Sequence, residues 1–299
     1  MQLKATILFL MFPLLLSSKV LAQEPHPKLV TWQELAALPL AAADHKISYG
    51  PDSLQFGELR LPQHGKSKYP VVVLVHGGCW LSQYNLQYMS HLGQALTQAG
   101  YATWNIEFRR VGDEGGAYPG TFLDVAKAAD HVQELAKTYP LDLKRVIVMG
   151  HSAGGHLALW LASRHKLPKS SPLYTPGPLK IRGVVSLAGI TDLRAYSQNE
   201  GSCNSAVSKL MGGMPAAHPD LYAAASPIEQ LPLRVPTRLV QGALDPIVPV
   251  EQAQRFTEQA REKGDQAQLI LLEQAGHFDL VAPQSAAWPA ILRAVDSLL

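Results

Sequence analysis

The stretch that decides the fold is Gly150-His151-Ser152-Ala153-Gly154, a G-x-S-x-G pentapeptide. It follows the apolar, largely β-branched run at 146–149 and precedes a helix-favouring run at 155–161. A strand, this pentapeptide and a helix in succession are typical of a sharp turn that exposes a serine hydroxyl as a nucleophile. Glycines suit such a turn because a Cβ would clash with the neighbouring backbone. The alternative is a glycine-rich turn with an incidental serine, but the flanking strand and helix favour a nucleophilic Ser152.

A serine hydroxyl is a weak nucleophile near neutral pH, so it needs a general base and an acid that orients the base. With this kind of turn, the acid and then the histidine follow along the chain, each on a loop after a strand. The run 237–242 predicts a strand whose loop carries Asp245, and 267–273 predicts a strand whose loop carries His277. Taken singly, Asp245 before a proline is an ordinary turn residue and His277 an ordinary loop residue. Their order and placement predict a Ser152–His277–Asp245 triad.

A buried strand is also predicted at 70–75, and it ends in His76-Gly77-Gly78-Cys79-Trp80. An H-G-G-x loop can aim backbone N–H groups at a developing oxyanion, since glycine permits the backbone angles and the close approach. We expect the amides of Gly78, Cys79 and Ala153 to form this oxyanion hole. His76 is expected to bond the loop backbone and not to act as the base.

In these motifs the chain resembles the α/β-hydrolases of the esterase/lipase type, and the resemblance covers nearly all of its length after the first 22 residues. The matching segments are H-G-G-C-W at 76–80, G-H-S-A-G-G at 150–155, G-A-L-D-P-I-V-P at 242–249 and A-G-H-F at 275–278. The segment at 105–112 resembles the branch with small carboxylesterase-like and kynurenine-formamidase-like hydrolases. One departure is Cys79, which stands where H-G-G-G is common. The resemblance implies an acyl-enzyme mechanism with no metal and no organic cofactor.

The fold class expected from the chain is α/β, an α/β-hydrolase fold with a mostly parallel central sheet and helices on both faces. Strand-like runs alternate with helix-like ones, which implies parallel strands joined by right-handed crossovers. An antiparallel edge hairpin is predicted at 46–49 and 55–61, and helices at 86–99 and 122–138. The alternation breaks at about 190–232, after the sixth predicted strand. An insertion there lies above the carboxyl edge of the sheet, so we expect a lid, with an uninvolved surface excursion as the alternative.

The first residues predict an export signal. Lys4 precedes an apolar run at 5–16, and Val20 and Ala22 occupy the small-residue positions of a cleavage site before Gln23. The apolar run is too short for a comfortable membrane span. We therefore expect a signal peptide at 1–22, a hydrolase domain at 23–299, and a periplasmic or secreted protein with no stable membrane anchor. An uncleaved anchor is the alternative.

The chain has two cysteines, Cys79 in the oxyanion loop and Cys203 in the insertion. An oxidising compartment permits a disulfide between them, which would fix the insertion over the site. Two free, buried thiols are the alternative, and the sequence leaves both open.

Charge and motif spacing exclude several other functions. The formal net charge is +2 with scattered Lys and Arg, which argues against a nucleic-acid partner. The eleven histidines show no H-E-x-x-H spacing, so no metal site is predicted. Trp80, Tyr84 and Tyr118 are candidates to line a pocket for an acyl or aryl group, although core packing would explain each of them. The oligomeric state stays open.

The sequence therefore predicts a serine hydrolase that cleaves carboxylic esters of small or medium acyl or aryl substrates. The first alternative is an amide hydrolase, acting on N-formylaryl amides or as an exopeptidase. The second is a non-catalytic binding protein on a hydrolase scaffold, because fold alone does not prove activity. A complete triad argues against a binding protein, which has no need of all three residues.

Overall fold

The computed structural model describes residues 27–63 and 67–299, so the predicted signal peptide at 1–22 lies outside the described residues. The described strands form one sheet in the order β1-β2-β4-β3-β5-β6-β7-β8. Their bounds are β1 His45–Ser48, β2 Phe56–Arg60, β3 Tyr69–Val75, β4 Ala102–Ile106, β5 Leu141–His151, β6 Gly183–Leu187, β7 Thr237–Gly242 and β8 Ala267–Leu272.

The sheet is mostly parallel, as predicted. β1 and β2 form the antiparallel edge hairpin, and β2 also runs antiparallel to β4. From β4 to β8 every neighbouring pair is parallel. The carboxyl ends of the parallel strands therefore meet at one edge of the sheet, where the predicted site loops begin.

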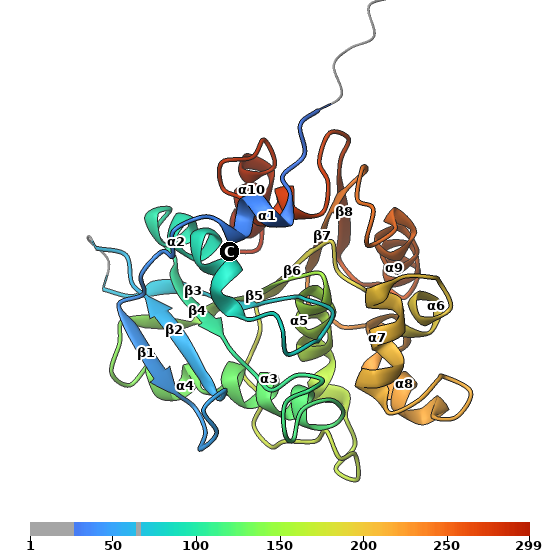
Figure 1. Cartoon of the computed structure of the whole chain (residues 1–299). Coiled ribbons are helices and arrows are strands. Elements are labelled where there is room, and N and C mark those ends of the chain that lie inside the picture. The colour runs from blue at the N-terminus through green and yellow to red at the C-terminus, as the bar shows by residue number, and fades with distance from the viewer. Residues whose placement is uncertain (1–26, 64–66) are drawn as a thin grey trace, which may run out of the picture.

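Helices cover both faces of the sheet (Figure 1). Because side chains alternate along a strand, Val71 and Val73 of β3 pack in one core cluster while Val72 and Leu74 pack in the other. The first cluster includes side chains of α3 Gly120–Asp130, α4 Val132–Leu135, α5 Ala153–Ser163 and α9 Val250–Glu262. The second includes side chains of α1 Trp32–Ala36, α2 Ser90–Gln98 and α10 Trp288–Asp296.

Two predicted helices are segmented in the structure. The run at 86–99 begins as the 3₁₀ turn η1 Leu86–Met89, capped by the Asn85 side chain, before α2 starts. The run at 122–138 divides into α3 and α4 at His131. The remaining 3₁₀ turns are η2 Arg164–Lys166, η3 Pro227–Gln230 and η4 Phe278–Val281.

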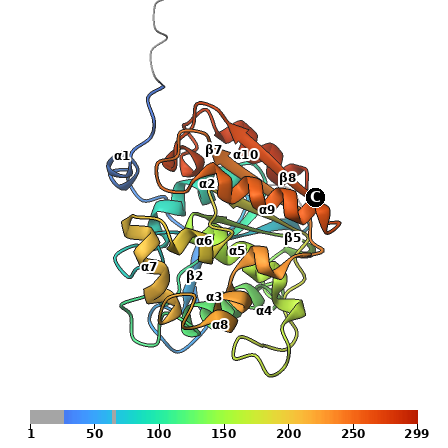
Figure 2. The same cartoon turned by 90° about the vertical axis from the view of Figure 1, so that its right-hand side faces the viewer.

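The insertion after β6 contains α6 Leu193–Ser197, α7 Ser202–Met211, α8 Pro219–Ala225 and then η3. Figure 1 shows these helices grouped with α9 on one side of the molecule, and Figure 2 views the molecule from that side. The first helix of the described chain, α1, is held by a reciprocal capping box between Thr31 and Glu34. The N-terminal arm contacts both early and late parts of the chain, because the Trp32 ring packs against Tyr84 and Phe278.

Candidate active site

Ser152 occupies a strained turn between β5 and α5. Its backbone has φ of +55° and ψ of −120°, a conformation that non-glycine residues seldom adopt. Its N–H donates to the Leu187 carbonyl at 2.8 Å. A Cβ on Gly150 would lie 2.0 Å from the Gly154 oxygen, and one on Gly154 would lie 2.0 Å from the Val75 oxygen. Only glycine fits at these two positions, as the sequence pattern indicates.

Asp245 and His277 are brought together from two separate loops. The His277 Nδ1 atom lies 2.7 Å from the Asp245 Oδ2 atom, and the Asp245 side chain is fully buried. The other carboxylate oxygen accepts from the N–H groups of Ile247 at 2.8 Å and Val248 at 2.9 Å. The acid is therefore rigidly held against the imidazole. The other acids that might orient a histidine bond elsewhere: Asp279 accepts from the Gly276 N–H, and Asp192 caps α6.

Ser152 and His277 line one cavity of about 470 Å³. The Ser152 hydroxyl and the His277 Nε2 atom are not within hydrogen-bond geometry in this structure. Such contacts are often long or poorly aligned before substrate binds. The arrangement places a serine hydroxyl and a paired histidine and aspartate at the same cavity, a set of groups that can act as nucleophile, base and orienting acid.

The loop after β3 has an unusual backbone. Gly78, Cys79 and Trp80 have φ values of +94°, +52° and +58°. The left-handed region costs a non-glycine residue about 1–2 kcal/mol. The N–H groups of Gly78 and Cys79 have no acceptor among the described residues, and neither does that of Ala153, the first residue of α5. The first N–H groups of a helix lack intrahelical partners, so an anion can bind there.

A buried group of charged and polar side chains bonds this loop, and His76 contacts the loop backbone as expected. Its ring contacts the Gly77 carbonyl through Nδ1 at 2.8 Å and the Glu107 carboxylate through Nε2 at 3.0 Å. Arg110 pairs with Glu107 at 3.1 Å and with Asp113 at 3.0 Å. Burial opposes ionisation of Glu107, but His76 and Arg110 outweigh it and hold the pKa of Glu107 below its ordinary value.

The two cysteines form a disulfide, which decides between the two alternatives that the sequence leaves open. Cys79 and Cys203 are bonded with their Cα atoms 4.9 Å apart. The bond joins the loop after β3 to α7 of the insertion.

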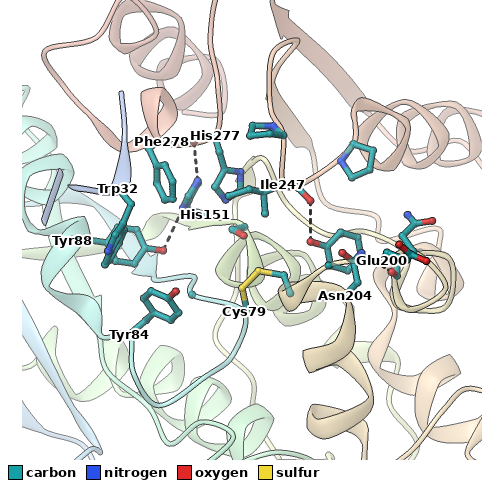
Figure 3. A pocket seen from close by; sticks show the side chains of 18 residues that line it. Trp32, Cys79, Tyr84, Tyr88, His151, Glu200, Asn204, Ile247, His277 and Phe278 are labelled. Atoms are coloured by element: carbon teal, nitrogen blue, oxygen red, sulfur yellow. Dashed lines mark hydrogen bonds between the residues drawn. A yellow bond between two sulfur atoms is a disulfide. The ribbon is translucent and has the colours of Figure 1, made fainter. Parts of the chain in front are cut away.

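The cavity has two unlike walls (Figure 3). On one side lies an aromatic cluster of Trp32, Tyr84, Tyr88 and Phe278. The centroid of the Trp32 ring lies 5.2 Å from that of Tyr84 and 5.8 Å from that of Phe278. The opposite side carries polar side chains of the insertion, among them Glu200 and Asn204. The disulfide lies between the two walls.

Of the three aromatic residues predicted for the pocket, only Tyr84 lines this cavity. Trp80 is 1% exposed and donates from Nε1 to the His156 ring at 3.2 Å, so it belongs to the core. Tyr118 packs edge-on against Phe122 at 5.7 Å. Trp80 has a positive φ and a side chain packed in the core, and neither could be read from residue type.

Several residues that line the cavity were not predicted from the sequence. Phe278 directly follows His277, and this adjacency is a usable signal. Trp32, Tyr88 and Tyr196 come from an arm, a 3₁₀ turn and the insertion, and nothing local marks them as site residues.

Within residues 27–63 and 67–299, no group of three or more His, Cys, Asp or Glu side chains is arranged to hold a metal ion. The helices of this same part of the chain are all too short or too polar to cross a membrane.

Comparison with known proteins places the chain among esterases. The BD-FAE family profile matches residues 58–260. The probable carboxylic ester hydrolase LipM of Mycobacterium tuberculosis is 26% identical over 240 residues, 77% of this chain and 54% of LipM. The isoprenylcysteine alpha-carbonyl methylesterase ICME of Arabidopsis thaliana is 26% identical over 251 residues, 78% of this chain and 56% of that protein. The chain thus spans about half the length of the curated relatives it matches.

Solved structures share the fold. The truncated form of a carbohydrate esterase from gut microbiota superposes with a TM-score of 0.74 at 22% identity, covering 87% of this chain and 96% of that one. Esterase B from Lactobacillus Rhamnosis gives a TM-score of 0.74 at 18% identity, covering 88% of each chain. Together with the profile match over more than half of its length, these findings show that the chain belongs to the BD-FAE family, within the α/β-hydrolases of the esterase/lipase type.

Proposed function

We propose that the protein hydrolyses carboxylic esters with Ser152 as nucleophile, His277 as base and Asp245 as the orienting acid. The observation that carries the proposal is the 2.7 Å contact between His277 and the buried Asp245 on the cavity that Ser152 also lines. The esterase relatives support ester chemistry. The unpaired amides of Gly78, Cys79 and Ala153 are suited to hold the oxyanion.

The reaction runs in two halves. His277 takes the Ser152 proton as the hydroxyl oxygen attacks the ester carbonyl, and the negative charge develops beside the unpaired amides. The carbon–oxygen bond to the alcohol then breaks, and the alcohol leaves with the proton from His277. Water, deprotonated by the same base, next attacks the acyl-enzyme and releases the acid with Ser152 restored.

The cavity volume of about 470 Å³ and its aromatic wall fit a small or medium acyl or aryl group. The polar groups of the insertion would then face the other part of the ester. We infer that the insertion acts as a lid, because it contributes Glu200 and Asn204 to the cavity and is joined to the oxyanion loop through Cys203.

The first prediction tests the nucleophile. Ser152→Ala should abolish almost all turnover of p-nitrophenyl esters, since loss of a triad member leaves only about 10³–10⁴-fold catalysis over water. A fluorophosphonate probe should label the wild type at Ser152 and leave the variant unlabelled. An unchanged melting temperature would show that the variant is folded. Equal labelling of both proteins would refute the assignment.

Amide hydrolysis is the second candidate, and two observations favour it. The uncharacterized peptidase YuxL of Bacillus subtilis is 26% identical over 258 residues, covering 78% of this chain. Glu200 offers a carboxylate at the cavity that could receive the amine of a peptide N-terminus. Parallel assays on p-nitrophenyl esters, N-formyl aryl amides and aminoacyl amides distinguish the two, and a higher kcat/KM on either amide would favour this candidate.

We also propose that the protein is exported, with cleavage before Gln23. The disulfide between Cys79 and Cys203 supports this, because such bonds persist in oxidising compartments. N-terminal sequencing of protein from cell fractions tests the proposal, and an intact Met1 in a cytosolic fraction would contradict it.

A further inference from the structure

Two buried side chains, Tyr88 and His151, link the loop after β3 to the loop that carries His277. The Gly77 N–H donates to the Tyr88 hydroxyl oxygen. The same hydroxyl lies 3.3 Å from His151 Nδ1, and His151 Nε2 lies 3.0 Å from the His277 carbonyl oxygen. Figure 3 shows the last two contacts across the aromatic end of the cavity. His151 is the residue directly before the nucleophile, so the link passes beside Ser152.

The direction of every bond in this link is determined by its ends. A carbonyl oxygen only accepts, so His151 Nε2 must carry the hydrogen that reaches His277. In the neutral ring Nδ1 is then an acceptor, and the Tyr88 hydroxyl must donate to it. The Tyr88 oxygen is left to accept the Gly77 N–H. One arrangement of protons satisfies all the groups, and bonds aligned in this way strengthen one another.

The surroundings keep both side chains neutral. Burial, together with the neighbouring His277, holds the pKa of His151 well below its ordinary value. Burial raises the pKa of Tyr88. The titratable groups that face His151 are Tyr88 from η1 and His277 from the loop after β8, with Asp245 behind His277.

The residues that form this link are closely packed against the loop after β3 and against Ser152. A Cβ on Gly77 would lie 2.5 Å from the His151 oxygen, 2.7 Å from the Tyr88 hydroxyl and 3.0 Å from the Ser152 Cβ. The rings of His151 and His277 have centroids 4.4 Å apart. A shift of Tyr88 or His151 would therefore move the oxyanion loop or the base relative to the nucleophile.

We propose that Tyr88 and His151 are positioning residues. They fix the positions of the oxyanion loop (residues 76–80) and of His277 relative to Ser152. This inference rests on the proposed function. Neither side chain takes a proton or touches the reacting atoms in the reaction described above. Their effect passes through Gly77 and the His277 backbone, and a misplacement of about 1 Å can cost roughly 10²-fold in rate.

Two replacements of His151 separate the halves of the link. In His151→Gln the amide nitrogen can reach the position of Nε2 and still donate to the His277 carbonyl. In His151→Asn the shorter amide reaches only the position of Nδ1, so the bond to His277 is lost while that to Tyr88 can persist. We expect kcat on p-nitrophenyl acetate to fall roughly 10- to 100-fold in His151→Asn, with KM nearly unchanged, and clearly less in His151→Gln.

The companion variant is Tyr88→Phe, which removes the acceptor of the Gly77 N–H and the donor to His151 while keeping the ring. Its kcat should fall by roughly 10-fold or more. His131→Gln is the control for general destabilisation, because the half-buried His131 between α3 and α4 packs against Trp104, with 6.1 Å between the ring centroids, and does not line the cavity. It should lower the melting temperature as His151→Asn does but keep kcat per folded molecule within about twofold of the wild type.

An NMR measurement tests the hydrogen-bond directions independently of catalytic activity. In ¹⁵N-histidine NMR, His151 should be neutral with the hydrogen on Nε2, and Tyr88→Phe should shift its Nδ1 signal while leaving that of His156 in place.

Folded His151→Asn with wild-type kcat would overturn the proposal. So would equal losses in the Gln and Asn variants, or a His151 with the hydrogen on Nδ1. If wild-type protein shows no ester hydrolysis and no labelling of Ser152, the proposed function fails first, and the NMR result still reports on the link.

Discussion

The strained backbone at Ser152 is flanked by Gly150 and Gly154, and an added Cβ at either position would clash with main-chain atoms. A Cβ on Gly154 would lie 2.0 Å from the Val75 oxygen and 2.5 Å from the His76 oxygen, both main-chain atoms of the neighbouring loop. We expect Gly154→Ala to lower the free energy of unfolding by more than about 3 kcal/mol. The added Cβ would force the turn that carries Ser152 and the loop after β3 to move apart.

Urea denaturation measures the effect of Gly154→Ala. The control is Gly177→Ala, since Gly177 has φ of +64° and no atom within 4 Å of an added Cβ. The control should lose only about 1–2 kcal/mol, the cost of left-handed backbone alone. Similar losses in both variants would mean that the contact with Val75 is unimportant.

Also at the scale of single residues, Asp245 determines which nitrogen of His277 carries the hydrogen. Asp245→Asn should keep the loop shape, yet its amide can present N–H to Nδ1 and favour the wrong tautomer. We expect a loss of roughly 10⁴-fold in kcat, with little change in stability. Asp279→Asn is the comparison, because Asp279 bonds the N–H groups of Val30 and Gly276 instead of the imidazole. A larger loss in Asp279→Asn than in Asp245→Asn would assign the acid to Asp279.

At the scale of elements, the disulfide couples the loop after β3, which we propose forms the oxyanion hole, to α7 across 124 residues of sequence. Cys203→Ala cuts the bond without changing a residue of the oxyanion loop. Release of a loop this long should lower stability by about 2–4 kcal/mol, and the freed α7 should lower kcat/KM by roughly 10-fold through loss of geometry.

Kinetics after thiol reduction should match those of Cys203→Ala if the bond itself matters. Thiol counting on unfolded, unreduced protein should find no free thiol. Wild-type kcat and KM in Cys203→Ala would show that the bond serves stability alone, and the insertion would then not act through the oxyanion loop.

At the scale of the whole molecule, the N-terminal arm completes a cavity built mainly by later parts of the chain. Trp32 of α1 contacts Tyr84, Tyr88 and Phe278, and the Val30 N–H bonds the Asp279 carboxylate after β8. Trp32→Ala should enlarge the aromatic end. We expect the ratio of kcat/KM for p-nitrophenyl octanoate over acetate to rise by roughly 10-fold, within the range that one or two methylene contacts provide.

The control for Trp32→Ala is Leu40→Ala, a change in the same arm at a side chain that is 63% exposed. It should leave the acyl-chain preference unchanged. If Trp32→Ala also left the ratio unchanged, the acyl group would have to bind on the polar side of the cavity instead.

The sequence alone determined the parts of this protein whose cause is local. The alternation of apolar runs specifies a parallel sheet, and the order of Ser152, Asp245 and His277 places them at the carboxyl ends of strands. The glycines at 150 and 154 are required by contacts that any such turn makes. These features depend on backbone angles and strand order, which neighbouring residues encode.

Only the tertiary structure decided the walls of the cavity and the links between loops. Trp80 and Tyr118 have the right residue types, but Trp80 packs in the core and Tyr118 packs half-buried against it. Trp32 and Tyr88 line the cavity although their segments carry no motif of an active site. The pairing of Cys79 with its partner was equally open in the sequence. The physical reason is that side-chain direction and contacts between distant segments depend on the packing of the whole chain, and no local pattern records that packing.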